Sequence, residues 1–183
     1  MTSERRDTPL ARALKARIRS HGPISVAEYM AACLHDPEHG YYRRMPAIGA
    51  DGDFVTAPEI SQVFGEMIGL WSAVVWQQMG APRAINLVEL GPGRGTLMRD
   101  ALRASAVLPQ FRAALAVHLV ESNATLRAEQ VHALSDCDVP VRHHDDAAGV
   151  LTGRAAGLAD APVIVVANEF LDALPVAQIG FSH

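Results

Sequence analysis

The sequence predicts an α/β fold with a parallel sheet at its centre, and three observations support this prediction. After Pro82, stretches with the apolar pattern of buried strands alternate with stretches of helical periodicity. The unbroken Val-Ile-Val-Val run at 163–166 is typical of a parallel strand buried on both faces. A turn with three glycines, between 91 and 95, directly follows one strand and precedes a helix. Such alternation implies right-handed crossovers between parallel strands.

Length and composition exclude several functional classes. The 183 residues, 49% of them hydrophobic, suffice for about one domain with a buried core and are too apolar for a disordered chain. A formal charge of −4 provides no basic surface for nucleic acid, so no nucleic-acid partner is expected. No apolar run approaches the ~18 residues that a membrane span needs. With only two cysteines and no apolar secretory signal, a cytosolic protein is expected.

The histidines and cysteines do not predict a metal site. His35 and His39 have the spacing of paired metal ligands, but Pro37 lies between them and the chain has no HExxH pattern. Cys33 and Cys137 are far apart in the sequence and cannot form a zinc site by themselves. We therefore expect no metal.

Two helices are predicted before the sheet. The segment 9–21 carries apolar residues at four-residue spacing and ends before Gly22. A second helix begins after Ser25, where Glu28 completes a capping box, and ends near His35.

An irregular segment, 36–58, follows these helices and leads into a third. Prolines and glycines break any period in this segment, and loops of such length are usually functional or disordered. The capping pattern recurs at Thr56 and Glu59 and predicts a helix of about five turns. The expected buried face of this helix consists of Ile60, Val63, Phe64, Met67, Leu70, Trp71, Val74 and Val75. We thus expect an N-terminal helical segment, 1–82, followed by the α/β part, 83–183.

The α/β part contains four predicted strands. They span 84–90, 115–120, 139–143 and 162–167. Helices are predicted at 96–106 and from a cap at Ser122 or Asn123 to about Leu134. The small and polar segment 147–160 is expected to be a mobile surface connection.

The turn Glu-Leu-Gly-Pro-Gly-Arg-Gly at 89–95 carries most information about function. Its glycines bend the chain sharply and allow a ligand to approach bare backbone at the carboxyl edge of the sheet. A dinucleotide fingerprint would require its third glycine at the position of Thr96. The spacing instead resembles the acidic-x-Gly-x-Gly-x-Gly signature of S-adenosylmethionine (SAM)-dependent methyltransferases. Gly91, Gly93 and Gly95 are therefore candidate cofactor-binding residues, with a structural turn or a dinucleotide site as alternatives.

Carboxylates at the ends of neighbouring strands fit the same cofactor. Glu89 could act near the positive groups of SAM, which carries a sulfonium and an amino acid end. Glu121, 32 residues later, ends the second strand, where a carboxylate would accept hydrogen bonds from both ribose hydroxyls. Asp145, after the third strand, is a candidate for binding the adenine amine. The alternative for Asp145 is a solvated cluster with the neighbouring aspartate and histidines.

Polar residues also follow the fourth strand, in the sequence NEFLDALP at 168–175. This position faces the transferable methyl group in a doubly wound sheet, and polar groups there can orient a substrate nitrogen. Alternatively, Asn168 and Asp172 cap the next helix or turn, and the two roles are compatible.

Taken together, these motifs resemble the MidA-like (DUF185-type) family, which includes the mitochondrial complex I assembly factor that is a protein arginine methyltransferase. The resemblance runs from about 24 to 178. It is carried by GDFVTAPEISQVFGE at 52–66, the glycine turn, Leu-Val-Glu at 119–121 and the segment 168–175. It implies a Rossmann-like class I SAM-dependent methyltransferase fold with SAM as cofactor. It also implies dimethylation of an arginine in the complex I subunit related to the 49 kDa quinone-site subunit.

The resemblance also implies roles for the Gly-Asp-Phe-x-Thr-x-Pro-Glu segment, which in the family forms part of the cofactor and substrate pocket. In this sequence it suggests Asp53 and Thr56, with Gly52, for the cofactor. It suggests Pro58 and Glu59 for the substrate. From the residues alone, Thr56 and Glu59 form only a capping box.

A mechanism follows from charge. The methyl group leaves the sulfonium for nitrogen by in-line displacement, so the protein mainly supplies positioning and a dry pocket. A guanidinium is almost always protonated and is a poor nucleophile. Glu169 is the first candidate to hold it bidentately and to localise its charge, with Asn168 and Asp172 as further catalytic candidates.

The predicted strand number differs from what the resemblance implies. The family fold usually has seven strands in a chain roughly twice as long, whereas we predict four strands. We therefore expect either a truncated chain or a partner that completes the sheet, because the fourth strand would otherwise expose an apolar edge. An alternative function is a non-catalytic SAM-binding or complex I assembly chaperone module. The expected location is the cytoplasm of a bacterium, or the mitochondrial matrix of a eukaryote.

Overall fold

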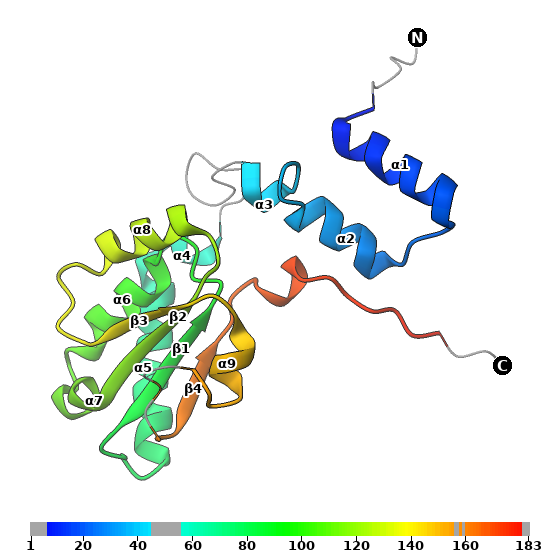
Figure 1. Ribbon diagram of the computed structural model, residues 1–183. Helices are drawn as coiled ribbons and strands as arrows, with labels where there is room; N and C mark the ends of the chain where they lie inside the picture. The colour runs from blue at the N-terminus through cyan, green and yellow to red at the C-terminus, as the bar shows by residue number, and fades with distance from the viewer. Residues whose placement is uncertain (1–6, 45–55, 156–157, 159, 181–183) are drawn as a thin grey trace. The chain divides into compact units, whose positions relative to one another are not determined.

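The computed structural model describes residues 7–44, 56–155, 158 and 160–180, and it divides the chain into two compact units (Figure 1). One unit comprises Met1–Ala47 and Leu171–His183, and the other comprises Ile48–Phe170. This division differs from the expected boundary at residue 82, because helix α5 (Gln62–Gln78) packs on a helix of the sheet-containing unit. In the described part of the chain, no helix is long and apolar enough to cross a membrane.

The first unit is helical. It contains α1 (Pro9–His21), α2 (Val26–His35), α3 (Tyr41–Arg44) and the 3₁₀ turn η1 (Leu171–Ala173). The capping box of α2 is confirmed: the Glu28 amide donates to Ser25 Oγ at 3.2 Å, and the Ser25 amide donates to the Glu28 carboxylate at 2.8 Å. Helix α3 was not predicted, and it lies inside the segment expected to be irregular.

The second unit is built on a four-stranded parallel sheet with the strand order β3-β2-β1-β4. The strands are β1 (Ile85–Leu90), β2 (Leu115–Val120), β3 (Val141–His144) and β4 (Val163–Val166), each within two residues of its predicted bounds. Glu89 of β1 lies opposite Leu119 of β2 and Val166 of β4. The carboxyl ends of the strands therefore meet at one edge of the sheet, as predicted.

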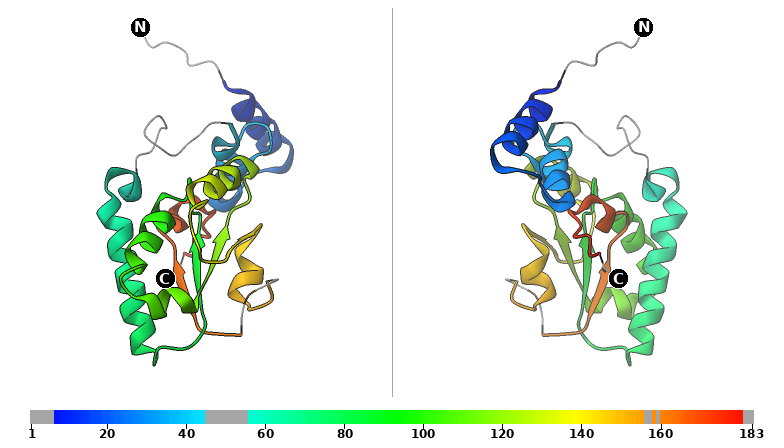
Figure 2. Two further views of the ribbon diagram at one scale, coloured as in Figure 1. Left: turned by 90° about the vertical axis from the view of Figure 1, so that its left-hand side faces the viewer. Right: turned by 90° about the vertical axis from the view of Figure 1, so that its right-hand side faces the viewer.

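Helices cover both faces of this sheet (Figure 2). Helices α5 and α6 (Thr96–Ser105) lie along one face together with α7 (Pro109–Ala114), and α9 (Ala147–Leu151) lies on the other. Helix α8 (Ala124–Ala133) contacts the loop that follows β1. Helices α6 and α8 confirm the predictions, whereas α7 was not predicted.

The core has one large and one small cluster, and they lie on opposite faces of the sheet. The larger cluster includes Trp76, Leu87, Met98, Phe111, Val117, Leu119 and Ile164. The smaller cluster consists of Val88, Leu90, Val120 and Val150 of α9. Helix α9 corrects the expectation of a mobile connection at 147–160. It begins after Asp146, whose carboxylate accepts a hydrogen bond from the Gly149 amide at 3.1 Å.

The expectation that the fourth strand is buried on both faces was wrong. Ile164 is buried in the larger cluster, but Val163 and Val165 on the other face are 38% and 40% exposed. Because β4 lies at the edge of the sheet and pairs only with β1 among the described strands, one of its faces is left partly open.

The predicted buried face of the third helix was also wrong. Side chains of that face, including Met67, Trp71 and Val74, are about half exposed. The helix instead turns Gly65, Gly69, Ser72, Ala73 and Trp76 inward. A Cβ atom at Gly69 would lie only 2.4 Å from the Ala101 carbonyl oxygen of α6, so small residues allow the two backbones to approach closely.

The expected single helix is interrupted at Ser61. The segment α4 (Ala57–Ile60) ends there, Ser61 is extended, and its hydroxyl accepts a hydrogen bond from the Val63 amide to start α5. This break follows from the serine side chain, which competes for the backbone amide at a helix start.

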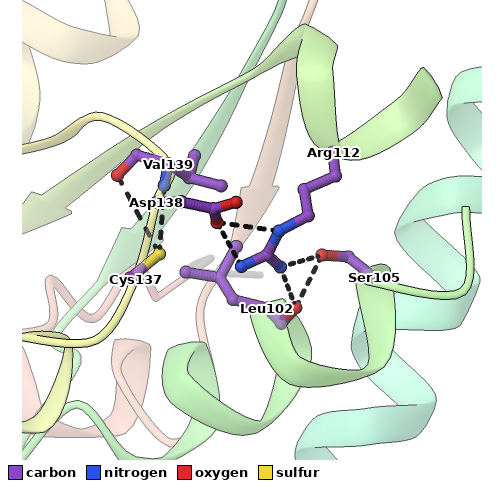
Figure 3. A network of polar contacts seen from close by, with 6 residues as sticks. All are labelled: Leu102, Ser105, Arg112, Cys137, Asp138 and Val139. Atoms are coloured by element: carbon purple, nitrogen blue, oxygen red, sulfur yellow. Dashed lines mark hydrogen bonds and ion pairs between the residues drawn. The ribbon is translucent and has the colours of Figure 1, made fainter. Parts of the chain in front are cut away.

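A polar network ties α6 and α7 to the loop before β3 (Figure 3). Arg112 of α7 donates to the carbonyl oxygen of Leu102 and, at 3.0 Å, to the hydroxyl of Ser105, both in α6. It also forms an ion pair with Asp138. A cation at the last carbonyls of α6 suits the helix dipole and fixes this end of the helix.

We predict that Gly69→Ala lowers the free energy of unfolding by about 1–3 kcal/mol, because the added methyl group collides with the Ala101 backbone. The collision costs more than the ~1 kcal/mol that alanine gains over glycine in helix propensity, so the net effect is destabilising. Val74→Ala, at an exposed position of the same helix, should change stability by less than about 0.5 kcal/mol. Urea unfolding followed by circular dichroism measures both, and equal effects would contradict the α5–α6 packing.

Candidate functional site

The glycine turn after β1 requires residues without side chains. Gly91, Gly93 and Gly95 have φ angles of +65°, +53° and +83°, in the left-handed region that glycine adopts at little cost. A Cβ atom at Gly91 would also lie 2.6 Å from the ring of Phe170, so the approach of this ring excludes other residues there. The turn is closed by a 2.8 Å hydrogen bond from the Gly95 amide to the Pro92 carbonyl oxygen.

Glu89, two residues before the turn, is a buried carboxyl group. Its residue is 2% exposed, and its Oε2 atom has no hydrogen-bond partner among the described residues. Burial raises the pKa of Glu89 to about 8. A buried carboxyl oxygen without a partner is costly for folding, and groups whose pKa is strongly shifted gather at functional sites. A cationic ligand group at this edge would supply the missing partner.

Glu121 directly follows β2 at the same edge of the sheet. Its amide donates to the His144 carbonyl oxygen at 3.0 Å, and its carboxylate accepts from the Asn123 amide at 2.7 Å. Burial raises the pKa of Glu121, against opposing effects of the Asn123 and Ser122 amides and of Arg127. The carboxylate is thus held in place by the backbone that begins α8.

Asp145 follows β3 and is engaged by an arginine. Arg127 of α8 donates to the Asp145 carboxylate at 2.7 Å and, through Nε, to the carbonyl oxygen of Glu121. The Asp145 side chain is 86% exposed. The structure therefore places Asp145 at the predicted edge as part of an ion pair, which any ligand contact would have to share or replace.

The segment that begins α4 lies beside the start of α6. The Thr56 side chain makes no capping hydrogen bond, so the expected capping box was wrong. Glu59 instead accepts a 2.6 Å hydrogen bond from the Thr96 hydroxyl, and Pro58 is buried. Gly52 and Asp53 lie outside the residues that the structure describes.

The residues after β4 reach the same edge. Asn168 is half-buried, and Glu169 is exposed with a φ angle of +48°, a left-handed conformation that costs a non-glycine residue about 1–3 kcal/mol. Phe170 follows and packs on the glycine turn. Asp172 belongs to the other compact unit, where burial and the charge of Asp172 raise the pKa of Tyr42.

Sequence reasoning missed three residues that hold this site together: Thr96, which donates to Glu59; Arg127, which pairs with Asp145; and Gln130, whose amide donates to the Gly93 carbonyl oxygen. The sequence did draw attention to Thr96, because this residue stands where a dinucleotide-binding fingerprint would have its third glycine. The other two act across long sequence separations and carried no local signal. Within the described ranges, no group of three or more His, Cys, Asp or Glu side chains could hold a metal ion.

This chain is similar to known methyltransferases both in sequence and in structure. The sequence pattern of a family of S-adenosyl-L-methionine-dependent methyltransferases matches residues 67–183. Protein arginine methyltransferase NDUFAF7 homolog, mitochondrial, of Drosophila melanogaster is 42% identical over 184 residues, which is 93% of this chain and 41% of that protein. Protein arginine methyltransferase NDUFAF7, mitochondrial, of Homo sapiens is 40% identical over 183 residues, or 92% of this chain and 42% of that protein.

A solved structure has the same fold and holds a ligand. A COG1565 superfamily member from Burkholderia thailandensis, crystallised with S-adenosyl-homocysteine, is 32% identical with a TM-score of 0.71. The match covers 91% of this chain and 42% of that chain. The present chain thus spans about two fifths of the length of the relatives it matches.

The raised pKa of Glu89 predicts how stability depends on pH. The pKa of Glu89 is about 8 in the folded protein and 4.5 in an unfolded chain, so the folded state favours the protonated carboxyl. The contribution of Glu89 to the free energy of unfolding is therefore fully present below pH 4.5 and is lost as pH rises toward 8. Glu89→Gln removes this loss, so we expect its stability relative to the parent protein to rise by about 4 kcal/mol between pH 4.5 and 8.

Chemical denaturation at several pH values gives this difference. The buried His118, whose pKa is lowered to about 4 by burial and by its neighbours His144 and Arg142, titrates in both proteins and cancels. A pH-independent difference would show that Glu89 is ionised normally in the folded protein.

Proposed function

This chain belongs to the S-adenosyl-L-methionine-dependent methyltransferase family, and on that premise we propose that it binds SAM at the carboxyl edge of its sheet and serves in the methylation of a protein arginine. The observation that carries the proposal is the unpartnered buried carboxyl group of Glu89 beside the left-handed glycine turn. A carboxylate in a dry site attracts a cation far more strongly than it does in water.

The residues at this edge fit the chemistry of a sulfonium nucleoside. Glu89 would face a cationic group, and Glu121 would accept hydrogen bonds from the ribose hydroxyls. The turn at 91–95 would offer its backbone to the ligand at Gly93, since Phe170 packs on Gly91 and Gln130 packs on Gly95. Asp145 would accept a hydrogen bond from the adenine amine, in competition with the one that Arg127 donates to it. When bound, SAM supplies an electrophilic methyl group on a positively charged sulfur.

The end of β4 is the proposed place for the substrate nitrogen. The left-handed backbone conformation of Glu169 changes the direction of the chain shortly after β4. Strained backbone conformations of this kind cluster at functional sites. The Glu169 carboxylate would hold the guanidinium bidentately and draw its positive charge away from the attacking nitrogen. Asn168 and Asp172 are the further polar candidates, and Pro58 and Glu59 would contribute to substrate binding.

The proposed target is an arginine side chain of a protein. Curated relatives carry the name protein arginine methyltransferase, which supports this substrate class. As a specific target we propose the respiratory complex I subunit related to the 49 kDa subunit, modified during assembly. The proposed location is the mitochondrial matrix in a eukaryote or the cytoplasm in a bacterium.

A second function is favoured by the outer edge of β4. Among the described strands β4 pairs only with β1, and such an edge is suited to pairing with another strand. A SAM-binding module that holds a complex I subunit during assembly, without transferring a methyl group, would use the same cofactor site.

We predict that SAM and S-adenosyl-homocysteine bind with an affinity that rises about tenfold per pH unit up to pH 8. The reason is that the Glu89 carboxyl must lose its proton before it can pair with a cation. Isothermal titration calorimetry between pH 6 and 8 measures this dependence. Glu89→Gln should bind weakly and with a much smaller pH dependence, whereas Asp136→Asn, at an exposed position, should behave like the parent protein. No heat with either nucleoside from the folded protein would defeat the proposal.

We further predict that Glu169→Gln lowers methyl transfer by a factor of about 100 while leaving S-adenosyl-homocysteine binding unchanged, because the carboxylate acts on the guanidinium and not on the cofactor. Transfer of a labelled methyl group to arginine in cell-extract proteins provides the assay, with Asp136→Asn as the matched loss of an exposed carboxylate. Binding without any transfer by the parent protein would favour the assembly module instead.

A further inference from the structure

Gln130 of α8 is a fully buried amide with both ends engaged. Its Nε2 group donates a 2.7 Å hydrogen bond to the Gly93 carbonyl oxygen, in the middle of the glycine turn. Its Oε1 atom accepts a 3.0 Å hydrogen bond from Nε2 of His143 in β3. A chain of hydrogen bonds therefore runs from β3 through α8 to the turn that follows β1.

The Gly93 carbonyl oxygen determines which way the Gln130 amide points, because it can only accept a hydrogen bond and so requires the NH₂ group. Oε1 is thereby turned toward His143, whose Nε2 must carry a hydrogen to donate to it. Protonation of His143 does not break this bond, because Nε2 carries a hydrogen in the charged form too. Burial, Arg127 and His144 lower the pKa of His143, which keeps the ring neutral near pH 7.

Helix α8 contacts the turn at two further points. A Cβ atom at Gly95 would lie 3.3 Å from Cγ and 3.4 Å from Cα of Gln130, so the helix packs directly against that glycine. The neighbouring Glu129 pairs with Arg94 of the turn at 2.9 Å. The side chain of Gln130 is the buried part of this contact, whereas Arg94 and Glu129 are partly exposed and contribute little.

We propose that Gln130, anchored at its other end by His143, is a positioning residue that holds the glycine turn in its left-handed conformation before the cofactor binds. The proposal rests on the proposed SAM site for its consequence, which is that less ordering of the turn is needed on binding and the affinity is correspondingly higher. The hydrogen bonds themselves are properties of the ligand-free protein.

The test compares Gln130→Met, which keeps the length of the side chain but removes both hydrogen bonds, with Val131→Ala at an exposed position of the same helix. Hydrogen exchange of the Gly95 amide in the ligand-free protein should become about tenfold faster in Gln130→Met, with exchange at Val117 in β2 unchanged. The affinity for S-adenosyl-homocysteine should fall about tenfold. Val131→Ala should match the parent protein in both measurements.

If Gln130→Met does not fold, His143→Phe tests whether Gln130 holds the glycine turn. It leaves Gln130 and its bond to Gly93 in place but removes the hydrogen bond that anchors Oε1, so we expect a two- to fivefold change in the same direction in both measurements. Unchanged exchange at Gly95 in the folded variant would overturn the proposal. If the parent protein does not bind S-adenosyl-homocysteine, the proposed function fails, and the exchange rates still decide whether Gln130 orders the turn.

Discussion

The burial of one carboxyl group, that of Glu89, is the constraint on which the other features of the site depend. The group lies near the end of a fully buried central strand, where a charge is expensive, and its Oε2 atom has no hydrogen-bond partner among the described residues. The parallel order of the strands brings Glu121 and Asn168 to the same edge, and the left-handed glycine turn lies beside them. The site is therefore an unsatisfied electrostatic arrangement that a cationic ligand would complete.

Local patterns in the sequence predicted the four strands and helices α6 and α8 well, because these elements have short-range signatures, whereas the short helices α7 and α9 were missed. They could not show which side of α5 faces inward. An apolar stripe and a stripe of small residues both occur on that helix, and close approach of two backbones selected Gly65 and Gly69 over the larger side chains. The exposure of Val163 depends on which strands lie beside β4, and this too has no local signal.

The candidate site was predicted where its residues belong to the strand ends and was missed where it depends on contacts between distant segments. Glu59 lies 37 residues before Thr96, and the hydrogen bond between them replaced the expected capping box. Gln130 lies 37 residues after Gly93, on a helix whose role the sequence did not indicate. Confirmation of the family supports the assignment of the cofactor, while the roles of Glu169 and the other individual residues remain proposals.

A crystal structure of this chain with S-adenosyl-homocysteine tests the central claim most directly. The account predicts that the ligand lies against the glycine turn, with its cationic amino group within hydrogen-bond distance of Glu89 and its ribose hydroxyls on Glu121. An empty edge at saturating ligand, or a ligand bound elsewhere with the Glu89 carboxyl still unpartnered, would contradict it.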